Sequence, residues 1–400
     1  MKTSAMLSSG RNRQRDITET MQLDPEISFN SPELMGKELE FMRDVVTRRH
    51  LSGSGHFTRL CEDRLQKELG SEKVLLTTSC TAALEMTAIL LNIQAGDEFI
   101  VPSFTFVSGA NAYVLRGAKP IFVDIRPDTL NIDERLVEER ITAKTKAIVV
   151  VHYAGVACEM EPLQAISKKY GVPVIEDNAH ALFGKYRGQP LGSFGTFATQ
   201  SFHETKNVIC GEGGALVINE LPFVERAEIL WEKGTNRKKF FAGLVDKYTW
   251  VDIGSSFLPS ELLAAFLFAQ LEEAEPIQSL RHGVWQYYYS QLQPRAKELK
   301  IALPFVPPDC DHAAHLFYIL LPNQTVRDQL IAFLRSRRIG SAFHYIPLHL
   351  SPMGRQFGYH DGDCPVTEDV SGRLLRLPFH NRLSREDQDR VIAAISEFSS

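Results

Sequence analysis

Short apolar runs alternate with amphipathic stretches along the chain from Gly70 to about residue 220. The runs predicted as strands are Lys73–Leu76, Glu98–Val101, Pro120–Asp124, Ala147–His152, Val172–Glu176, Phe197–Ser201 and Gly214–Ile218. The stretches predicted as helices are Ala82–Leu91, Val107–Leu115, Arg135–Ile141 and Leu163–Tyr170. Strands that are apolar throughout and separated by helices indicate a mostly parallel sheet covered on both faces.

The pattern changes in the last third of the chain. From Ser260 to about Gln293, apolar residues recur at helical spacing, and Pro276 interrupts the run. The elements predicted after it are a strand over His315–Leu321, a helix over Thr325–Arg337, a strand over Ile339–His344 and a helix over Glu386–Phe398 with Ser384 as its N-cap. We therefore expect a flexible extension over residues 1–25, a large α/β domain over 26–295 and a small α+β domain over 296–400.

Composition narrows the class of protein. The net charge of −5 and the absence of a basic run argue against nucleic acid as a partner. The longest apolar helical run, Leu262–Ala269, is too short to span a bilayer, and the first residues lack the apolar core of a secretory signal. Six scattered cysteines without a CxxC pair predict free thiols and no metal site. We expect a cytoplasmic protein with no membrane partner.

A first candidate site lies where the strand ending near Thr77 meets the next helix. The segment Thr77–Leu84 places small hydroxyl residues, Ser79 and Thr81 among them, at a helix start. Free backbone N–H groups and hydroxyl donors there favour a bound anion. The alternative is an N-cap that serves the helix alone.

Two further residues follow strands predicted to lie in the same sheet. Asp177 ends one strand, and Lys206, 29 residues later, lies beside a glycine-rich turn over Gly211–Ala215. A carboxylate keeps a pyridine nitrogen protonated, and a deprotonated lysine forms an imine with an aldehyde. Considered alone, each residue has a simpler interpretation. Asp177 would cap the next segment, and Lys206 would be an exposed loop lysine. In this order, anion site, carboxylate and lysine resemble the layout of pyridoxal phosphate (PLP) enzymes of fold type I, the aspartate-aminotransferase fold.

Longer motifs extend the resemblance from about Ile27 to the C-terminus. They are Ser79–Met86, Pro102–Val107, Leu115–Lys119, His152–Met160, Ser201–Asn207, Lys233–Arg237, Val245–Trp250, Asp252–Ser256 and Phe343–His349. In these motifs the chain resembles the DegT/DnrJ/StrS family of sugar aminotransferases. Within that family it is most similar to the transaminases that make dTDP-4-amino-4,6-dideoxygalactose.

The resemblance implies a role for each matching residue. It implies that Lys206 holds PLP as an imine, that Asp177 pairs with the pyridine nitrogen and that Phe106 stacks on the ring. His180 takes the place near the ring hydroxyl that many relatives give to glutamine. The residues implied to hold the phosphate are Cys80, Thr81, Ser201 and, from a second subunit, Ser256 in place of the usual asparagine. The residues implied on the substrate side are His344, Tyr345 and His349, with a structural role open for either histidine.

The resemblance also implies a reaction and an assembly. L-Glutamate would give its amino group to C4 of a nucleotide-linked 4-keto-6-deoxy sugar, in a homodimer whose active site is shared between subunits. Amination at C3, or a UDP- or GDP-linked sugar, stays open. The sugar 3-dehydratases of the family have a histidine in place of the lysine, which argues against that activity here. A non-catalytic PLP-binding regulator would need a DNA-binding module, for which residues 1–25 are too short.

Overall fold

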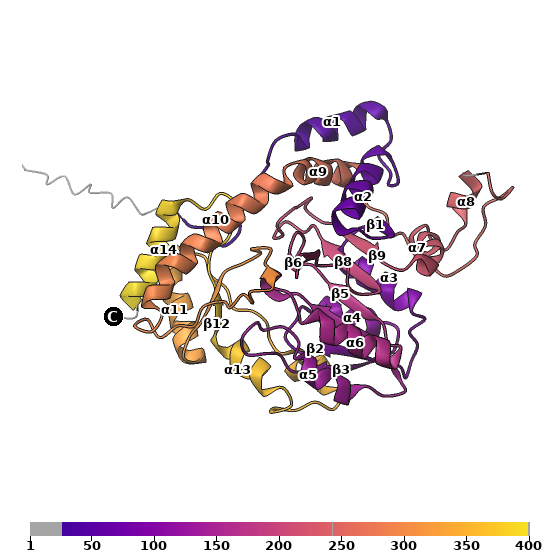
Figure 1. Ribbon diagram of the computed structural model, residues 1–400. Coiled ribbons are helices and arrows are strands. Elements are labelled where there is room, and N and C mark those ends of the chain that lie inside the picture. The colour runs from indigo at the N-terminus through magenta and orange to yellow at the C-terminus, as the bar shows by residue number, and fades with distance from the viewer. Residues whose placement is uncertain (1–25, 242, 399–400) are drawn as a thin grey trace, which may run out of the picture.

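A seven-stranded sheet forms the centre of the computed structural model, which describes residues 26–241 and 243–398 (Figure 1). The strands lie in the order β1-β9-β8-β5-β4-β2-β3. They are β1 (Lys73–Thr77), β2 (Glu98–Pro102), β3 (Lys119–Val123), β4 (Thr145–Val151), β5 (Val174–Asp177), β8 (Phe197–Ser201) and β9 (Gly214–Ile218). Within this sheet β9 alone runs opposite to the other six strands, so its pairings with β1 and β8 are antiparallel and the rest are parallel. The predicted mostly parallel sheet is therefore confirmed.

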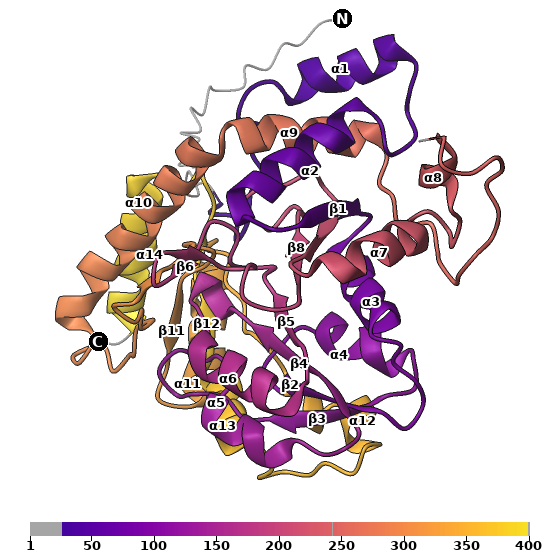
Figure 2. The ribbon, with the colours of Figure 1, turned by 45° about the vertical axis from the view of Figure 1, so that its right-hand side comes forward.

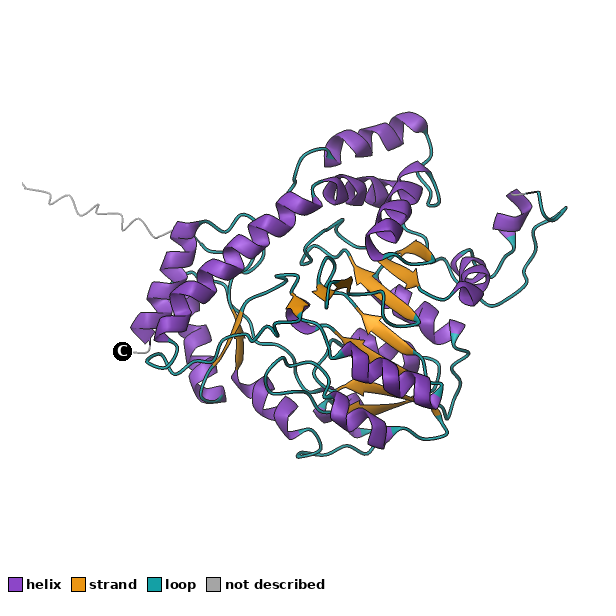
Figure 3. Cartoon of the chain, in the orientation of Figure 1, coloured by secondary structure: helices purple, strands orange, loops and turns teal. Residues whose placement is uncertain are grey.

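Helices cover both faces of this sheet (Figure 3). One face packs against α3 (Cys80–Leu90), α4 (Val107–Val114) and α7 (Val224–Trp231). The other face packs against α2 (His56–Leu69), α5 (Glu134–Val137), α6 (Met160–Tyr170) and α9 (Glu261–Glu272). Successive strand residues such as Phe197 and Ala198 belong to opposite clusters, because strand side chains alternate between faces. All seven strands are largely buried, because helices cover both faces of the sheet.

A second cluster of buried side chains lies beside the sheet (Figure 2). It is built from α10 (Ala274–Leu292), α11 (Gln324–Ser336), α14 (Arg385–Phe398) and the antiparallel pair β11 (Tyr318–Leu320) and β12 (Leu374–Arg376). Ile27 belongs to it as well, through a parallel bridge to Ile339. The boundary predicted near residue 295 follows α10, and the extension predicted over residues 1–25 lies outside the described residues.

Three predictions about these elements need correction. No strand forms over Ile339–His344; the segment makes single bridges at Ile339 and Ala342, to different neighbours, and so lacks a continuous partner. The stretch Arg135–Ile141 is not one helix, since α5 tightens into a 3₁₀ turn over Glu138–Arg140. The long helix breaks at Glu273 and not at Pro276, which is tolerated in the first turn of α10.

The elements α2, α7 and β12 were not predicted from the sequence, and neither were the remaining ones. They are α1 (Glu38–Arg48), α8 (Arg237–Phe241), α12 (Pro352–Arg355), α13 (Pro365–Arg373), β6 (Lys185–Tyr186), β7 (Gln189–Pro190) and β10 (Cys310–Asp311). The predicted N-cap is present, because Ser384 Oγ accepts the Asp387 N–H at 3.0 Å. All six cysteines are free, as predicted. Among the described helices, none has the length and apolar character that crossing a membrane requires.

Two polar residues, Asp124 and His349, connect the C-terminal part to the sheet through hydrogen bonds. Asp124, just after β3, accepts the N–H groups of Val366 and Thr367 at the start of α13, both at 2.8 Å. His349 is fully buried; its Nδ1 lies 2.6 Å from Ser103 Oγ and its Nε2 lies 3.0 Å from Glu368 Oε1. Both ring nitrogens of His349 are thus engaged within the protein, which favours the structural role for this residue.

Candidate active site

The carboxyl ends of the parallel strands bring Asp177, Lys206 and Cys80 together. Asp177 is the last residue of β5, Lys206 follows β8 by five residues, and Cys80 begins α3. The Cys80 thiol lies 3.9 Å from Asp177 Oδ1 and 3.4 Å from Thr199 Oγ1 on β8. Ligands of open α/β sheets bind at this edge, where the strand order reverses.

The start of α3 forms a small polar cradle. Ser79 Oγ accepts the Ala82 N–H at 3.1 Å, so Ser79 is the N-cap. A side chain on Gly214 would place its Cβ 2.4 Å from the Cys80 nitrogen, so only glycine lets β9 approach here. Ser201 pairs with Gly214 across the sheet, and Thr81 Oγ1 lies 2.7 Å from Ser108 Oγ. Hydroxyls and a helix N-terminus that meet in this way suit a phosphate group.

Burial sets the charge of the two central groups. It lowers the pKa of Lys206 to about 8, against the opposing effects of Cys80 and Asp177 and with the help of two nearby arginines. Burial also raises the pKa of Asp177, an effect that the Ala179 N–H, at 3.1 Å from its Oδ1, and the charge of Lys206 partly offset. A lysine with an accessible neutral form therefore lies beside a carboxylate that a positive partner would stabilise.

Three histidine rings line the same space. His180 lies on β5's side of the site, and its ring stacks on His315 with centroids 4.2 Å apart. Its Nδ1 accepts the Ala154 N–H at 3.4 Å. His344 stacks further along, 6.1 Å from His180. Burial holds the pKa of all three well below the usual histidine value, so the rings are neutral.

Sequence reasoning missed His315 and the role of Asn207 beside it. The Asn207 amide nitrogen donates to Ala313 O at 2.7 Å and to Gln278 Oε1 at 2.9 Å. Its Oδ1 therefore accepts the Nδ1–H of His315, at 2.9 Å. The hydrogen bond fixes the ring proton of His315 on Nδ1. The one sequence signal was the position of Asn207 directly after Lys206.

The other residues implied by the resemblance range from buried to exposed. Phe106, the N-cap residue of α4, is 56% exposed, and its ring lies 6.5 Å from that of Tyr345. The rings of Tyr345 and His344 are 3.4 Å apart, and His344 Nδ1 lies 3.0 Å from Tyr153 Oη. Ser256 is exposed and precedes Phe257, whose carbonyl accepts the Thr78 N–H near the start of α3.

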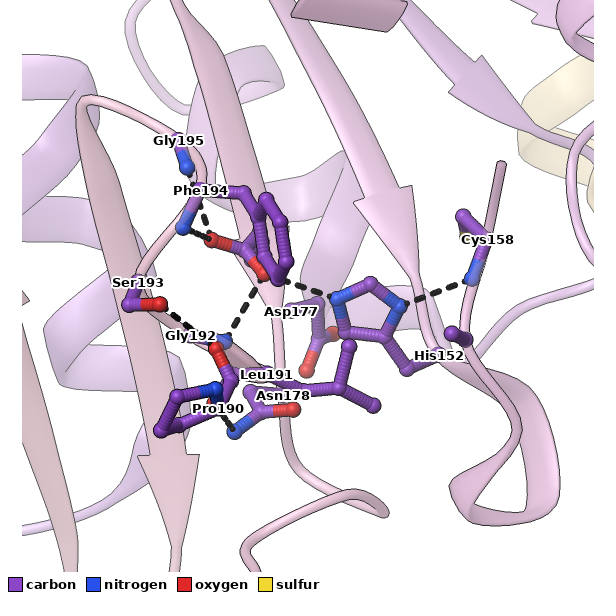
Figure 4. A network of polar contacts seen from close by, with 12 residues as sticks. His152, Cys158, Asp177, Asn178, Pro190, Leu191, Gly192, Ser193, Phe194 and Gly195 are labelled. Carbon is purple, nitrogen blue, oxygen red and sulfur yellow. Dashed lines mark hydrogen bonds and ion pairs between the residues drawn. The ribbon is translucent and has the colours of Figure 1, made fainter. Parts of the chain in front are cut away.

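A buried network supports the end of β5 from behind (Figure 4). Glu176, next to Asp177, accepts the N–H groups of Gly192, Phe194 and Gly195 at 2.7–2.8 Å. His152 Nε2 donates to Glu176 Oε2 at 2.9 Å, since His152 Nδ1 accepts the Cys158 N–H. The network fixes the backbone from which Asp177 projects.

We expect Glu176→Ala to destabilise the protein by at least about 3 kcal/mol, because several buried N–H groups lose their acceptor. Thermal unfolding followed by circular dichroism measures the effect. Glu139, which is exposed, provides the control Glu139→Ala, with an unchanged Tm. A Tm of Glu176→Ala equal to that of the control would contradict the role given to the network.

The side chains of this site suit each part of PLP. The cradle at α3 matches the phosphate, Asp177 a protonated ring nitrogen and Lys206 an aldehyde carbon. Gly214 lets β9 pack directly against the backbone of Ser79 and Cys80 and so supports the start of α3.

Comparison with known proteins identifies the same chemistry. The model of the DegT/DnrJ/EryC1/StrS aminotransferase family matches residues 32–396. An uncharacterised protein of Methanocaldococcus jannaschii is 33% identical over 346 residues, which cover 85% of this chain and 89% of that protein.

Two solved structures share the fold. A Streptococcus pneumoniae protein described as a sugar aminotransferase, in its PMP form, has a TM-score of 0.87 and 27% identity, covering 93% of this chain and 99% of that one. It has also been solved in its PLP form. Helicobacter pylori PseC, an aminotransferase involved in the biosynthesis of pseudoaminic acid, has a TM-score of 0.84 and 27% identity, covering 94% of this chain and 99% of that one. The chain therefore belongs to the DegT/DnrJ/EryC1/StrS aminotransferase family, with the fold of its PLP-dependent members and PLP as its cofactor.

Proposed function

We propose that this aminotransferase moves the amino group of L-glutamate to C4 of dTDP-4-keto-6-deoxyglucose, giving dTDP-4-amino-4,6-dideoxygalactose. The observation that carries the transamination is the buried Lys206 amine, which lies with Asp177 and His180 at one sheet edge. The sugar and its C4 position rest on the motifs shared with that group of transaminases.

Each side chain of the site has a separate role in the proposed reaction. PLP, when bound, supplies an aldehyde that links to amines and a ring that withdraws electrons. Lys206 would hold the cofactor at rest and would move a proton at its Nζ in both half-reactions. Asp177 would keep the ring nitrogen protonated, and neutral His180 would serve the ring hydroxyl. Cys80, Thr81 and Ser201 would hold the phosphate.

The pKa of Lys206 predicts how capture of the cofactor depends on pH. The amine reacts only when it is neutral, and with a pKa of about 8 roughly a tenth of it is neutral at pH 7. An ordinary lysine would have only about 0.03% in that form. We expect the rate at which cofactor-free protein binds PLP to rise with pH and to level off above about 8.5. A rate that keeps rising tenfold per pH unit beyond pH 9 would show an unshifted lysine.

A substrate panel tests the proposed reaction. The holoenzyme is incubated with L-glutamate and with dTDP-, UDP- and GDP-linked 3-keto and 4-keto 6-deoxy sugars, and NMR identifies the product. We expect one product, aminated at C4 of the dTDP sugar with the galacto configuration. Amination at C3, or of a UDP or GDP sugar, would establish the alternative within the family. PLP binding without amination of any of these sugars would favour a regulator.

We also propose a homodimer in which Ser256 reaches the partner's phosphate site. The segment that carries Ser256 follows α8, which projects from the body of the molecule (Figure 1). Large apolar side chains are exposed at the end of α8 and in the segment after it, namely Phe241 at 70%, Leu244 at 72% and Trp250 at 76%. Exposed apolar area of this kind marks a protein interface. Light scattering is expected to give twice the chain mass of 45.0 kDa, and Trp250→Glu should shift it toward the monomer. Separately, we propose that the protein is located in the cytoplasm.

A further inference from the structure

The ring of His315 is oriented by hydrogen bonds to its own neighbours in the fold. Asn207 donates from its amide nitrogen to Ala313 O at 2.7 Å, which fixes the amide so that Oδ1 is left for the ring. His315 Nδ1 lies 2.9 Å from that oxygen and therefore carries the ring proton. Arg281 holds the adjoining backbone, donating to Ala314 O at 3.0 Å and to His315 O at 2.5 Å. Both the plane and the tautomer of this ring are thus set by the fold.

His180 stacks on the ring that is fixed in this way. The centroids of His180 and His315 are 4.2 Å apart, and their planes meet at 22°. The ring of His344 is further off, with its centroid 6.1 Å from that of His180. The hydrogen bond that His180 Nδ1 accepts from the Ala154 N–H is long, at 3.4 Å against a usual 2.7–3.2 Å. A bond of this length holds a ring weakly, so the stack on His315 is the contact that sets its plane.

The two stacked rings are neutral, and one of them has a donor to spare. Burial lowers the pKa of His180 and of His315 well below the usual histidine value, and Lys206 adds to the effect on both. The other groups that lower one or the other pKa are His344, Arg281 and Arg376. Because Nδ1 of His180 is an acceptor, its proton is on Nε2. Among the residues that the structure describes, none accepts this Nε2–H.

We propose that His315 is a positioning residue, which holds the ring of His180 so that its Nε2–H serves the ring hydroxyl of the cofactor. The inference rests on the proposed function, which gives that hydroxyl to His180, and adds the residue that supports it. His315 and Asn207 act through His180 and not on the reacting atoms. A donor draws electron density from the hydroxyl oxygen, which also helps to hold the proton of the Lys206 imine. Without the donor, the imine keeps its proton to a higher pH.

The first test follows the visible absorbance of PLP-loaded protein against pH, which gives the midpoint at which the imine loses its proton. His315→Ala removes the stack, whereas His315→Phe keeps a ring and loses only the bond to Asn207. His180→Ala removes the donor itself, and the double variant with His315→Ala shows whether the two residues act together. His282→Ala, which changes an exposed histidine on α10, is the control. Thermal unfolding shows whether each variant is folded.

A second test needs no cofactor. NMR of cofactor-free protein with ¹⁵N-labelled histidine gives the tautomer of each ring, and the signals missing from His315→Phe and His180→Ala identify the two residues. We expect the ring proton on Nδ1 in His315 and on Nε2 in His180. Asn207→Ala should leave His315 as a mixture of tautomers, because nothing then selects Nδ1. If His315→Ala does not fold, these signals decide.

We expect His180→Ala and His315→Ala each to raise the midpoint by about 0.4–1 pH unit, the effect of one hydrogen bond, and the double variant to raise it no further. His315→Phe should raise it less, and His282→Ala should match the wild type. An unchanged midpoint in His315→Ala, additive shifts in the double variant, or a proton on Nε2 of His315 would each overturn the inference. An unchanged midpoint in His180→Ala would overturn the role of His180 and the inference with it. A holoenzyme that shows these shifts but aminates none of the sugars would overturn the proposed function and still support the inference.

Discussion

We expect Lys206→Ala to leave no measurable turnover. General acid–base catalysis alone contributes roughly 10²–10⁴-fold, and the variant also loses the covalent hold on the cofactor. The proposed role assigns both tasks to the one amine that burial brings near neutrality. The measurements are the rate of transfer from glutamate and the visible band of the imine, which borohydride should remove in the wild type while the reduced cofactor stays on the protein through dialysis.

One further variant separates the nucleophilic amine of Lys206 from its positive charge, and a second variant is the control. Lys206→Arg keeps the positive charge beside Asp177 but offers no nucleophile, since a guanidinium stays protonated. It should be as inactive as the alanine variant. Lys185, an exposed lysine, provides Lys185→Ala, which should keep full activity and the full band. Turnover within tenfold of wild type in either Lys206 variant would remove the lysine from the reaction.

We expect Asp177→Asn to lower kcat roughly 10²–10³-fold, the usual cost of one preorganised electrostatic contact. The amide keeps the shape of the carboxylate and can still accept the Ala179 N–H, so folding should be preserved. What it loses is the negative charge that holds a proton on the pyridine nitrogen. Steady-state kinetics with glutamate and the proposed sugar nucleotide measure the effect.

The control for this variant is Asp63→Asn, which changes an exposed aspartate on α2. It should not alter kcat or Tm. PLP should still bind to Asp177→Asn through Lys206, so the visible band should persist with its position changed. A kcat equal to that of the control would show that the charge of Asp177 is not used.

The large sheet was predictable because its strands are buried on both faces and are therefore rich in apolar residues. Phe197–Ser201 and Gly214–Ile218 were located to the residue. The antiparallel direction of β9 was not, since an apolar run looks the same in either direction. The strand predicted over Ile339–His344 does not form. Its neighbours, Ile27 and Arg376, offer only single pairings and come from opposite ends of the chain.

The residues of the site also differ in whether the sequence could predict them. Asp177 and Lys206 stand at strand ends, where local pattern and chain order point to them. His315 comes from the C-terminal part and meets the sheet edge only after folding, so no local sequence pattern indicates it. His349, in a matching motif, proved to be fully enclosed by Ser103 and Glu368.

The bridge between Ile27 and Ile339 has a consequence for biosynthesis. The ribosome adds roughly 5–20 residues per second, so about 15–60 s pass between the synthesis of the two residues. The sheet, complete by Ile218, can form long before then, while the segment around Ile27 still lacks its partner. We expect a nascent chain stopped near residue 300 to resist proteolysis over its sheet and to be cut readily around Ile27.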